Sequence, residues 1–247
     1  MKKFDMSSAW DDAVQLARSD LALTGPVIGM LVVLPMLAFA VVGPVPIEPP
    51  PDADLAALGA ILRADLAQSA PMLVLISFLS VLASLVVMRL WLAPRGTSVG
   101  EALATGVGLV PAMLVMFVIQ LLAMGLAALA LLVPAFYLAG RLAPAFAVLA
   151  AGDTRSPLAA LDQAWGMTRG NGWRIALMLF LIQLVIAIAS MLVDGVGSMF
   201  GVRGTIGHAV ASLASAALAG AVALVAYAVN AAIYRQLSPT VMARTFE

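Results

Sequence analysis

The sequence has no cysteine and few charged residues. Without cysteine, the chain has no disulfide bond, no thiolate metal ligand and no cysteine nucleophile. Only 11% of its 247 residues are charged, whereas an ordinary soluble domain has about 25%. The 13 basic and 13 acidic residues give a net charge of zero, so no large basic surface is available to nucleic acid. We therefore expect no nucleic-acid partner.

Histidine is nearly absent as well, and His208 is the single one. No histidine cluster or pair of carboxylates suited to acid–base catalysis is present in the sequence. Residues 96–100 match the G-x-S-x-G pattern of hydrolase nucleophiles, but that motif works on a strand-to-helix turn, and here it falls between apolar runs. Asp194 and His208 flank a glycine-rich turn, where a lone pair is usually solvated. We expect no enzymatic activity, no cofactor and no metal site.

Hydrophobic residues make up 63% of the chain. They gather in charge-free intervals near or beyond the roughly 20 residues that a membrane-spanning helix needs. These intervals are Leu21–Ile47, Leu66–Met88, Ala102–Gly140, Ile175–Val193 and Gly204–Tyr234. The third is too long for one span at about 1.5 Å per residue, so we expect a second span over about Leu131–Ala150, bent by Pro134 and Pro144. The prediction is an all-α polytopic membrane protein with about six transmembrane helices.

The distribution of lysine and arginine also favours six spans, because cytoplasmic loops are enriched in these residues. With six spans and a cytoplasmic N-terminus, only Arg63 and Arg203 lie outside. The basic residues then predicted inside are Lys2, Lys3, Arg18, Arg89, Arg95, Arg155, Arg169, Arg174, Arg235 and Arg244. With five spans, the two sides would be nearly balanced. We therefore predict a multi-pass protein of the bacterial inner membrane with both termini in the cytoplasm.

Short amphipathic helices are expected beside the spans, within a single integral membrane domain of residues 1–247. Residues 1–20 are predicted to lie along the cytoplasmic surface, with Trp10, Val14, Ala17 and Leu21 on one side. Residues 44–70 predict an outer proline-rich loop, then a short helix capped by Asp52. Its apolar stripe is expected to dock on the protein's own spans, because the nearby charges are mostly acidic. The stripe consists of Leu55, Leu58, Leu62 and Leu66.

Residues 153–174 predict a cytoplasmic surface helix followed by a turn into the membrane. Ser156 can cap the helix, Pro157 suits its first position, Gly170 can end it in the left-handed conformation, and Asn171 can cap the next helix. Two tryptophans are expected at headgroup depth, and two arginines are placed to reach lipid phosphates. These four residues are Trp165, Trp173, Arg169 and Arg174.

The stretch YLAGR, from Tyr137 to Arg141, followed by ALDQAWGMTRGNGWRI, also carries a family resemblance. It resembles the multi-span membrane domain joined to some bacterial glycerophosphodiester phosphodiesterases, and related stand-alone bacterial membrane proteins. About residues 130 to 180 carry the resemblance. We expect no soluble phosphodiesterase domain, which needs histidines and metal-binding acids. The resemblance therefore implies the membrane part of that family and not its enzymatic activity.

A few polar residues fall inside the predicted spans. Arg141 predicts either an anion or lipid-headgroup site, with Tyr137 one turn earlier, or an arginine whose side chain reaches the inner interface. Gln120, Gln183 and Asn230 either hydrogen-bond between helices or line a hydrophilic path. Our leading hypothesis is a non-enzymatic envelope protein that interacts with membrane lipids, with other membrane proteins or with a second copy of itself. The alternative is a small-solute or ion transporter or channel.

Overall fold

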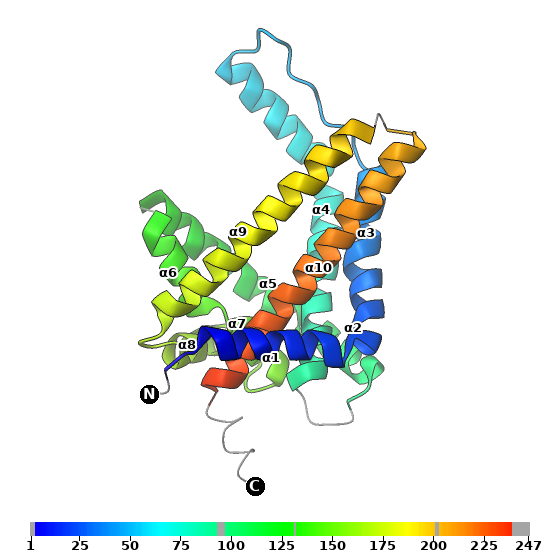
Figure 1. Ribbon diagram of the computed structural model, residues 1–247. Coiled ribbons are helices and arrows are strands. Elements are labelled where there is room, and N and C mark those ends of the chain that lie inside the picture. Colours follow the sequence, from blue (N-terminus) through cyan, green and yellow to red (C-terminus); the bar gives the residue numbers. More distant parts are fainter. Residues whose placement is uncertain (1–2, 93–96, 131, 201–202, 239–247) are drawn as a thin grey trace.

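The apolar intervals are helical in the structure, and six helical segments are long and apolar enough to cross a membrane (Figure 1). The computed structural model describes residues 3–92, 97–130, 132–200 and 203–238, and every element in these ranges is a helix. The six segments are Leu21–Val42, Leu55–Leu92, Val99–Ala128, Val133–Ala151, Gly172–Phe200 and Ile206–Leu237. The predicted all-α fold with six spans is confirmed, including the division of the longest interval into two.

Two of the spans are interrupted. The first consists of α2 (Leu21–Ile28), the π-helical turn η1 (Gly29–Val33) and α3 (Leu34–Val42). The N–H of Leu34 donates to the carbonyl of Gly29, five residues back, and this wider turn accommodates Pro35. The fourth span consists of α6 (Leu132–Leu142) and α7 (Ala145–Ala151). They are separated at Pro144, which confirms one predicted bend, whereas Pro134 lies in the first turn of α6, where its missing N–H costs little.

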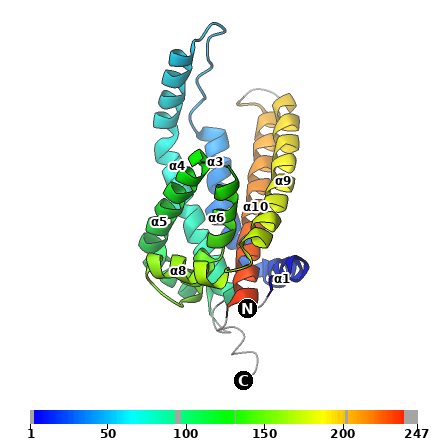
Figure 2. The ribbon, with the colours of Figure 1, turned by 90° about the vertical axis from the view of Figure 1, so that its left-hand side faces the viewer.

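The second span, α4 (Leu55–Leu92), is much longer than predicted. The prediction of a separate short helix after the proline-rich loop is wrong, because its residues continue into the span as one 38-residue helix. Asp54, not Asp52, caps it, since its Oδ1 accepts the N–H of Ala57 at 2.7 Å. The predicted docking of the leucine stripe is also wrong. All four leucines are exposed, from 41% to 88%, and this end of α4 projects beyond the neighbouring helices (Figures 1 and 2).

Two short helices lie at the opposite end of the bundle from that projection: α1 (Met6–Ser19) and α8 (Pro157–Met167) (Figure 1). Helix α1 crosses the spans and packs on α10 (Ile206–Leu237). The side of α1 that we identified is only partly in contact. Ala17 packs against the buried cluster, but Trp10 is 43% exposed, and the buried residues are Ala9, Ala13 and Leu16.

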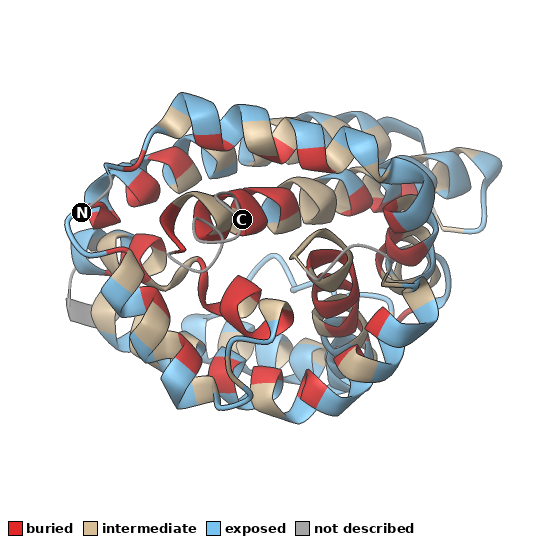
Figure 3. Ribbon diagram, turned by 90° about the horizontal axis from the view of Figure 1, so that it is seen from below, coloured by how far each residue is buried: buried red, intermediate tan, exposed pale blue. Residues whose placement is uncertain are grey.

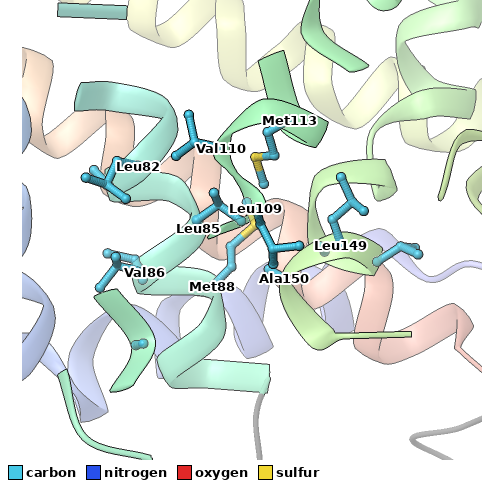
Figure 4. Close-up of a cluster of buried hydrophobic side chains, with 14 of the residues drawn as sticks. Leu82, Leu85, Val86, Met88, Leu109, Val110, Met113, Leu149 and Ala150 are labelled. Carbon is cyan, nitrogen blue, oxygen red and sulfur yellow. The ribbon is translucent and has the colours of Figure 1, made fainter. Parts of the chain in front are cut away.

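The spans form a chain of neighbouring pairs. Helix α4 packs on α5 (Val99–Ala130), α5 on α6, α6 on α9 (Gly172–Gly197), and α9 on α10. The most densely packed part lies at the end that carries α1 and α8 (Figure 3). There, residues 82–88 of α4 and 147–150 of α7 are all buried, together with side chains of α5 (Figure 4). The opposite end of the bundle contains far fewer buried residues.

The contact between α1 and α10 includes an ion pair whose removal should not weaken the protein. Asp12 Oδ1 lies 3.1 Å from Arg235 Nη1. Burial raises the pKa of the Asp12 carboxyl above its ordinary value of 3.8, and Arg235 offsets this only in part. The folded state therefore favours protonation of Asp12 more than the unfolded chain does, and the stability from this pKa shift is present at low pH and lost as pH rises through the folded pKa.

We expect Asp12→Asn to leave the free energy of unfolding unchanged or to raise it by less than about 1 kcal/mol at neutral pH. Thermal unfolding in detergent, followed at about pH 4 and pH 7, measures this. The gain should be confined to the higher pH. Asp11→Asn, on the exposed side of α1, is the matched control. A loss of stability in Asp12→Asn alone at neutral pH would show that the ion pair is net stabilising.

Candidate functional site

The structure places Arg141 inside the protein, where α6 meets α8. The side chain is only 4% exposed. Its Nη2 donates to the carbonyl of Trp165 at 2.5 Å, and its Nη1 lies 3.3 Å from the hydroxyl of Tyr137. The guanidinium carbon lies 4.0 Å from the centre of the Trp165 ring, a cation–π contact. The carbonyl belongs to the last turn of α8, where the helix dipole favours a cation.

Two glycines bring α6 and α9 into backbone contact beside this arginine. A Cβ atom at Gly140 would lie 2.5 Å from the carbonyl oxygen of Gly172 and 2.7 Å from the nitrogen of Ala176. A Cβ at Gly172 would lie 2.6 Å from Cδ of Arg141. All three distances are shorter than real Cβ atoms tolerate, so the helix crossing requires glycine at both positions. The turn before α9 needs a third glycine, because Gly170 has a φ of +78°.

The polar residues of the same turn fasten α8 to its neighbours. Thr168 is fully buried, and its Oγ1 lies 2.7 Å from the carbonyl of Ala164 and 3.0 Å from that of Arg141. We predicted that the Asn171 side chain would cap α9, but it makes no such bond. Its Oδ1 instead accepts the N–H of Phe4 at 2.9 Å. We call this set the α6–α8–α9 junction. It consists of Tyr137, Gly140, Arg141, Trp165, Thr168, Asn171 and Gly172.

Around the junction, four aromatic or basic side chains remain accessible. Trp165 is 43% exposed and Trp173 is 58% exposed. The Trp173 ring centre lies 5.1 Å from that of Tyr137, so the exposed ring is supported by the junction. Arg169 and Arg174 are exposed too. Tryptophan and arginine in this combination are typical of a membrane–water interface, and the junction holds them in place.

The intramembrane amides do not all gather in one place. Gln120 and Asn230 line the same large cleft, whereas Gln183 is exposed on α9 and is not among the cleft residues. Arg141 does not line the cleft either. The helices therefore do not form a hydrophilic path that is lined by all four residues together. Two of the four, Gln120 and Asn230, lie in one cavity.

The cleft has a volume of about 1570 Å³ and lies between α3, α4, α5 and α10. From Ser212 to Asn230 on α10 it extends 18 residues, which is about 27 Å at 1.5 Å per residue. Most of its wall is apolar. Lining residues such as Val74 and Leu121 are exposed, at 68% and 60%, whereas Met88 is buried. The cleft is therefore deep, runs along the spans and opens to the side of the bundle.

Few polar groups interrupt this apolar wall. Gln120 Nε2 is buried and has no hydrogen-bond partner among the described residues. Tyr227 donates its hydroxyl to the carbonyl of Ser80 at 3.0 Å, which ties α10 to α4. At one end, Ser215 donates to Asp194 Oδ1 at 3.2 Å. The amide of Gln120 is thus the one group in the wall that presents a buried, unpaired donor within the part of the chain that the structure describes.

The remaining sequence motifs have structural roles. Ser98 and Glu101 bond each other's backbone N–H groups at the start of α5, as in a capping box. His208 Nε2 lies 3.4 Å from both the carbonyl of Ala40 and the hydroxyl of Ser212, and no contact with Asp194 is recorded. Among residues 3–92, 97–130, 132–200 and 203–238, no three acidic or histidine side chains are close enough to hold a metal ion.

No family model, no curated protein and no solved structure matches this chain. A functional proposal therefore depends on the junction and the cleft themselves. The cleft was not predicted as a cavity, because its walls consist of ordinary apolar residues from helices that are distant in the sequence. Gln120 and Asn230 were its available signals, and the sequence does not distinguish them from Gln183.

Proposed function

We propose that this chain is a non-enzymatic protein of the bacterial inner membrane that binds a membrane lipid, with an acyl chain in the cleft. The observation that carries the proposal is the cleft itself, about 1570 Å³ in volume and open to the side of the bundle. Ligand pockets are commonly about 300–1,000 Å³ and mostly apolar, with a few polar groups that orient the ligand. The cleft is larger than most and is shaped as a long trough.

The position of the cleft favours a lipid over a water-soluble ligand. Its length of about 27 Å is close to the roughly 30 Å thickness of a bilayer's hydrocarbon core, and its rim residues Val74 and Leu121 face the side of the bundle. Acyl chains are the solvent of that region. An ester carbonyl would supply the acceptor that Gln120 Nε2 lacks.

The orientation of the protein follows from the same proposal. The end that carries α1 and α8 also carries the exposed Arg169 and Arg174 with their neighbouring tryptophans. Such a basic, aromatic rim fits the cytoplasmic interface, where anionic headgroups are abundant. Both α1 and the last turn of α10 lie at this end (Figure 1), which agrees with cytoplasmic termini and six spans.

Filling the cleft should reduce the lipid that purifies with the protein. We expect Ala219→Phe, whose ring would enter the cleft, to lower bound lipid per protein at least about threefold, with Gln120→Leu giving a smaller loss. Mass spectrometry of the intact protein in detergent and of its extracted lipids measures both. Ala221→Phe is the matched control, two residues away on the exposed side of α10.

The outcome separates lipid from other occupants. Equal lipid content in Ala219→Phe and Ala221→Phe would contradict the proposal. A dimer that Ala219→Phe converts to a monomer, without a change in lipid, would assign the cleft to a second copy of the chain.

Transport of a small solute is the second candidate, favoured by Asp194, Gln120 and Asn230 along one cleft. Flux into liposomes that Ala219→Phe blocks would favour transport.

A further inference from the structure

A second cavity lies at the densely packed end of the bundle. Its volume is about 520 Å³, and it is bounded by the last turns of α4, the first turns of α5 and the connection between α7 and α8. Its polar lining residues are Arg89, Arg155, Thr105 and Thr154. None of the described residues that line it is acidic. Two arginines and two hydroxyl groups around one small cavity make it electropositive and rich in hydrogen-bond donors.

Arg89 is held in position and yet keeps donors unused. Its Nη1 donates to the carbonyl of Ala150 at 3.1 Å, which fixes the guanidinium against the end of α7. Its Nε is buried and has no hydrogen-bond partner in the described part of the chain. Gly152 leaves room for this arrangement, because its φ is +85° and a Cβ there would lie 2.9 Å from Arg89 Nη1. A buried donor without a partner is costly, so Arg89 keeps hydrogen-bonding capacity beside this cavity.

The connection to α8 contributes further donors. Arg155 is exposed at the cavity, and no ion pair is recorded for it within the described residues. Thr154 Oγ1 accepts the N–H of Ser156 at 3.1 Å, which leaves its hydroxyl proton to donate elsewhere. Two acids close in sequence to the lining residues, Asp153 and Glu101, are already hydrogen-bonded. Asp153 Oδ2 accepts from Tyr234 at 2.6 Å and from Gln163 at 3.0 Å, and Glu101 Oε2 accepts from Ser98.

We propose that this cavity binds a phosphate group, carried by the headgroup of an anionic lipid or by a free phosphate ester. Guanidinium groups match phosphate oxygens in shape and charge, and basic pockets between transmembrane helices are a known form of headgroup site. Arg89 and Arg155 pair with the phosphate oxygens, while Thr154 adds a neutral hydrogen bond. The site is separate from the acyl-chain cleft, and this proposal does not depend on the cleft proposal.

Calorimetric titration in a maltoside detergent, which carries no phosphate, tests the site. The probes are short-chain phosphatidylglycerol, short-chain phosphatidylcholine and inorganic phosphate. We expect phosphatidylglycerol to bind, and Arg155→Gln to weaken it about tenfold or more, as the loss of a charged hydrogen bond implies. Arg18→Gln, an exposed arginine on α1 at the same end, should leave binding unchanged. Arg155 has no recorded contact that holds the fold, so this variant should fold normally.

The probes distinguish the two sources of phosphate. Binding of phosphatidylglycerol without inorganic phosphate assigns the site to a lipid headgroup, whereas binding of inorganic phosphate that Arg155→Gln weakens assigns it to a free phosphate ester. The proposal would be overturned if Arg155→Gln and the native protein bound phosphatidylglycerol with equal affinity. It would also be overturned if phosphatidylglycerol and phosphatidylcholine bound equally well and inorganic phosphate did not bind. Ala219→Phe should keep this binding, so failure of the cleft proposal is seen separately.

Discussion

Gly140→Ala should destabilise the protein by about 3 kcal/mol, near the upper end of what overpacking usually costs. The added methyl group would lie 2.5 Å from the carbonyl oxygen of Gly172 and 2.7 Å from the backbone nitrogen of Ala176. These are backbone atoms of α9, which cannot rotate away, so α6 and α9 must separate. Separation also loosens the contact of Tyr137 with Trp173. Thermal unfolding in detergent, followed by tryptophan fluorescence, measures the effect.

A matched glycine substitution serves as the control. Gly125 lies in α5, and a Cβ there would meet nothing within 4 Å. Gly125→Ala should therefore be neutral or stabilising by up to about 1 kcal/mol, because alanine is the better helix former. If Gly140→Ala proves as stable as Gly125→Ala, then α6 and α9 do not pack as closely as the structure places them.

Arg141→Met should destabilise the protein by about 2–4 kcal/mol, from a charged hydrogen bond and a desolvated cation–π contact. Methionine keeps most of the apolar stem, but it leaves the carbonyl of Trp165 without its donor. Helix α8 should then detach, so that proteases cut the 153–171 segment faster. Arg141→Lys should be intermediate, because an ammonium group keeps the charge and lacks the planar shape that stacks on Trp165.

Arg169→Met is the control, since Arg169 is exposed and has no recorded partner within the described residues. It should change stability by less than about 0.5 kcal/mol. The pair also distinguishes the predicted ligand-binding role of Arg141 from the structural role that its buried contacts with α8 indicate. Lost lipid binding in Arg141→Met with unchanged unfolding would identify a ligand-binding arginine. Lower stability with faster proteolysis would identify a residue that positions α8 and the exposed tryptophans.

The number of spans was predictable because it depends on length and charge alone. A bilayer requires about 20 apolar residues for each helix, and the charge-free intervals meet that requirement wherever they occur. The surface helix after Ser156 was predictable for a similar local reason: Ser156 and Pro157 have fixed backbone preferences and take their expected roles at its start. Gly170 is left-handed as predicted, but it lies in the turn after the helix, which already ends at Met167. These properties do not depend on which helices pack against each other.

Properties that depend on rotation about a helix axis or on a distant partner were not predictable. Gln120 and Gln183 look alike in sequence, yet one faces the cleft and the other faces outward. Asn171 was predicted to cap α9, but the N–H of Phe4 takes its oxygen, and that contact spans 167 residues. The prediction for Leu55–Leu66 failed because the helix continues through Gly59 and Pro71 into the span.

The partners of α1 have a consequence for biosynthesis. Phe4 bonds to Asn171, Asp5 to Gln236, and Asp12 pairs with Arg235. The partners of α1 therefore lie at least 167 residues later in the sequence, so α1 has no docking surface until they have been translated. Helix α1 can pack on α10 only after α10, the sixth span, has been inserted. The docking of α1 therefore follows the insertion of α10.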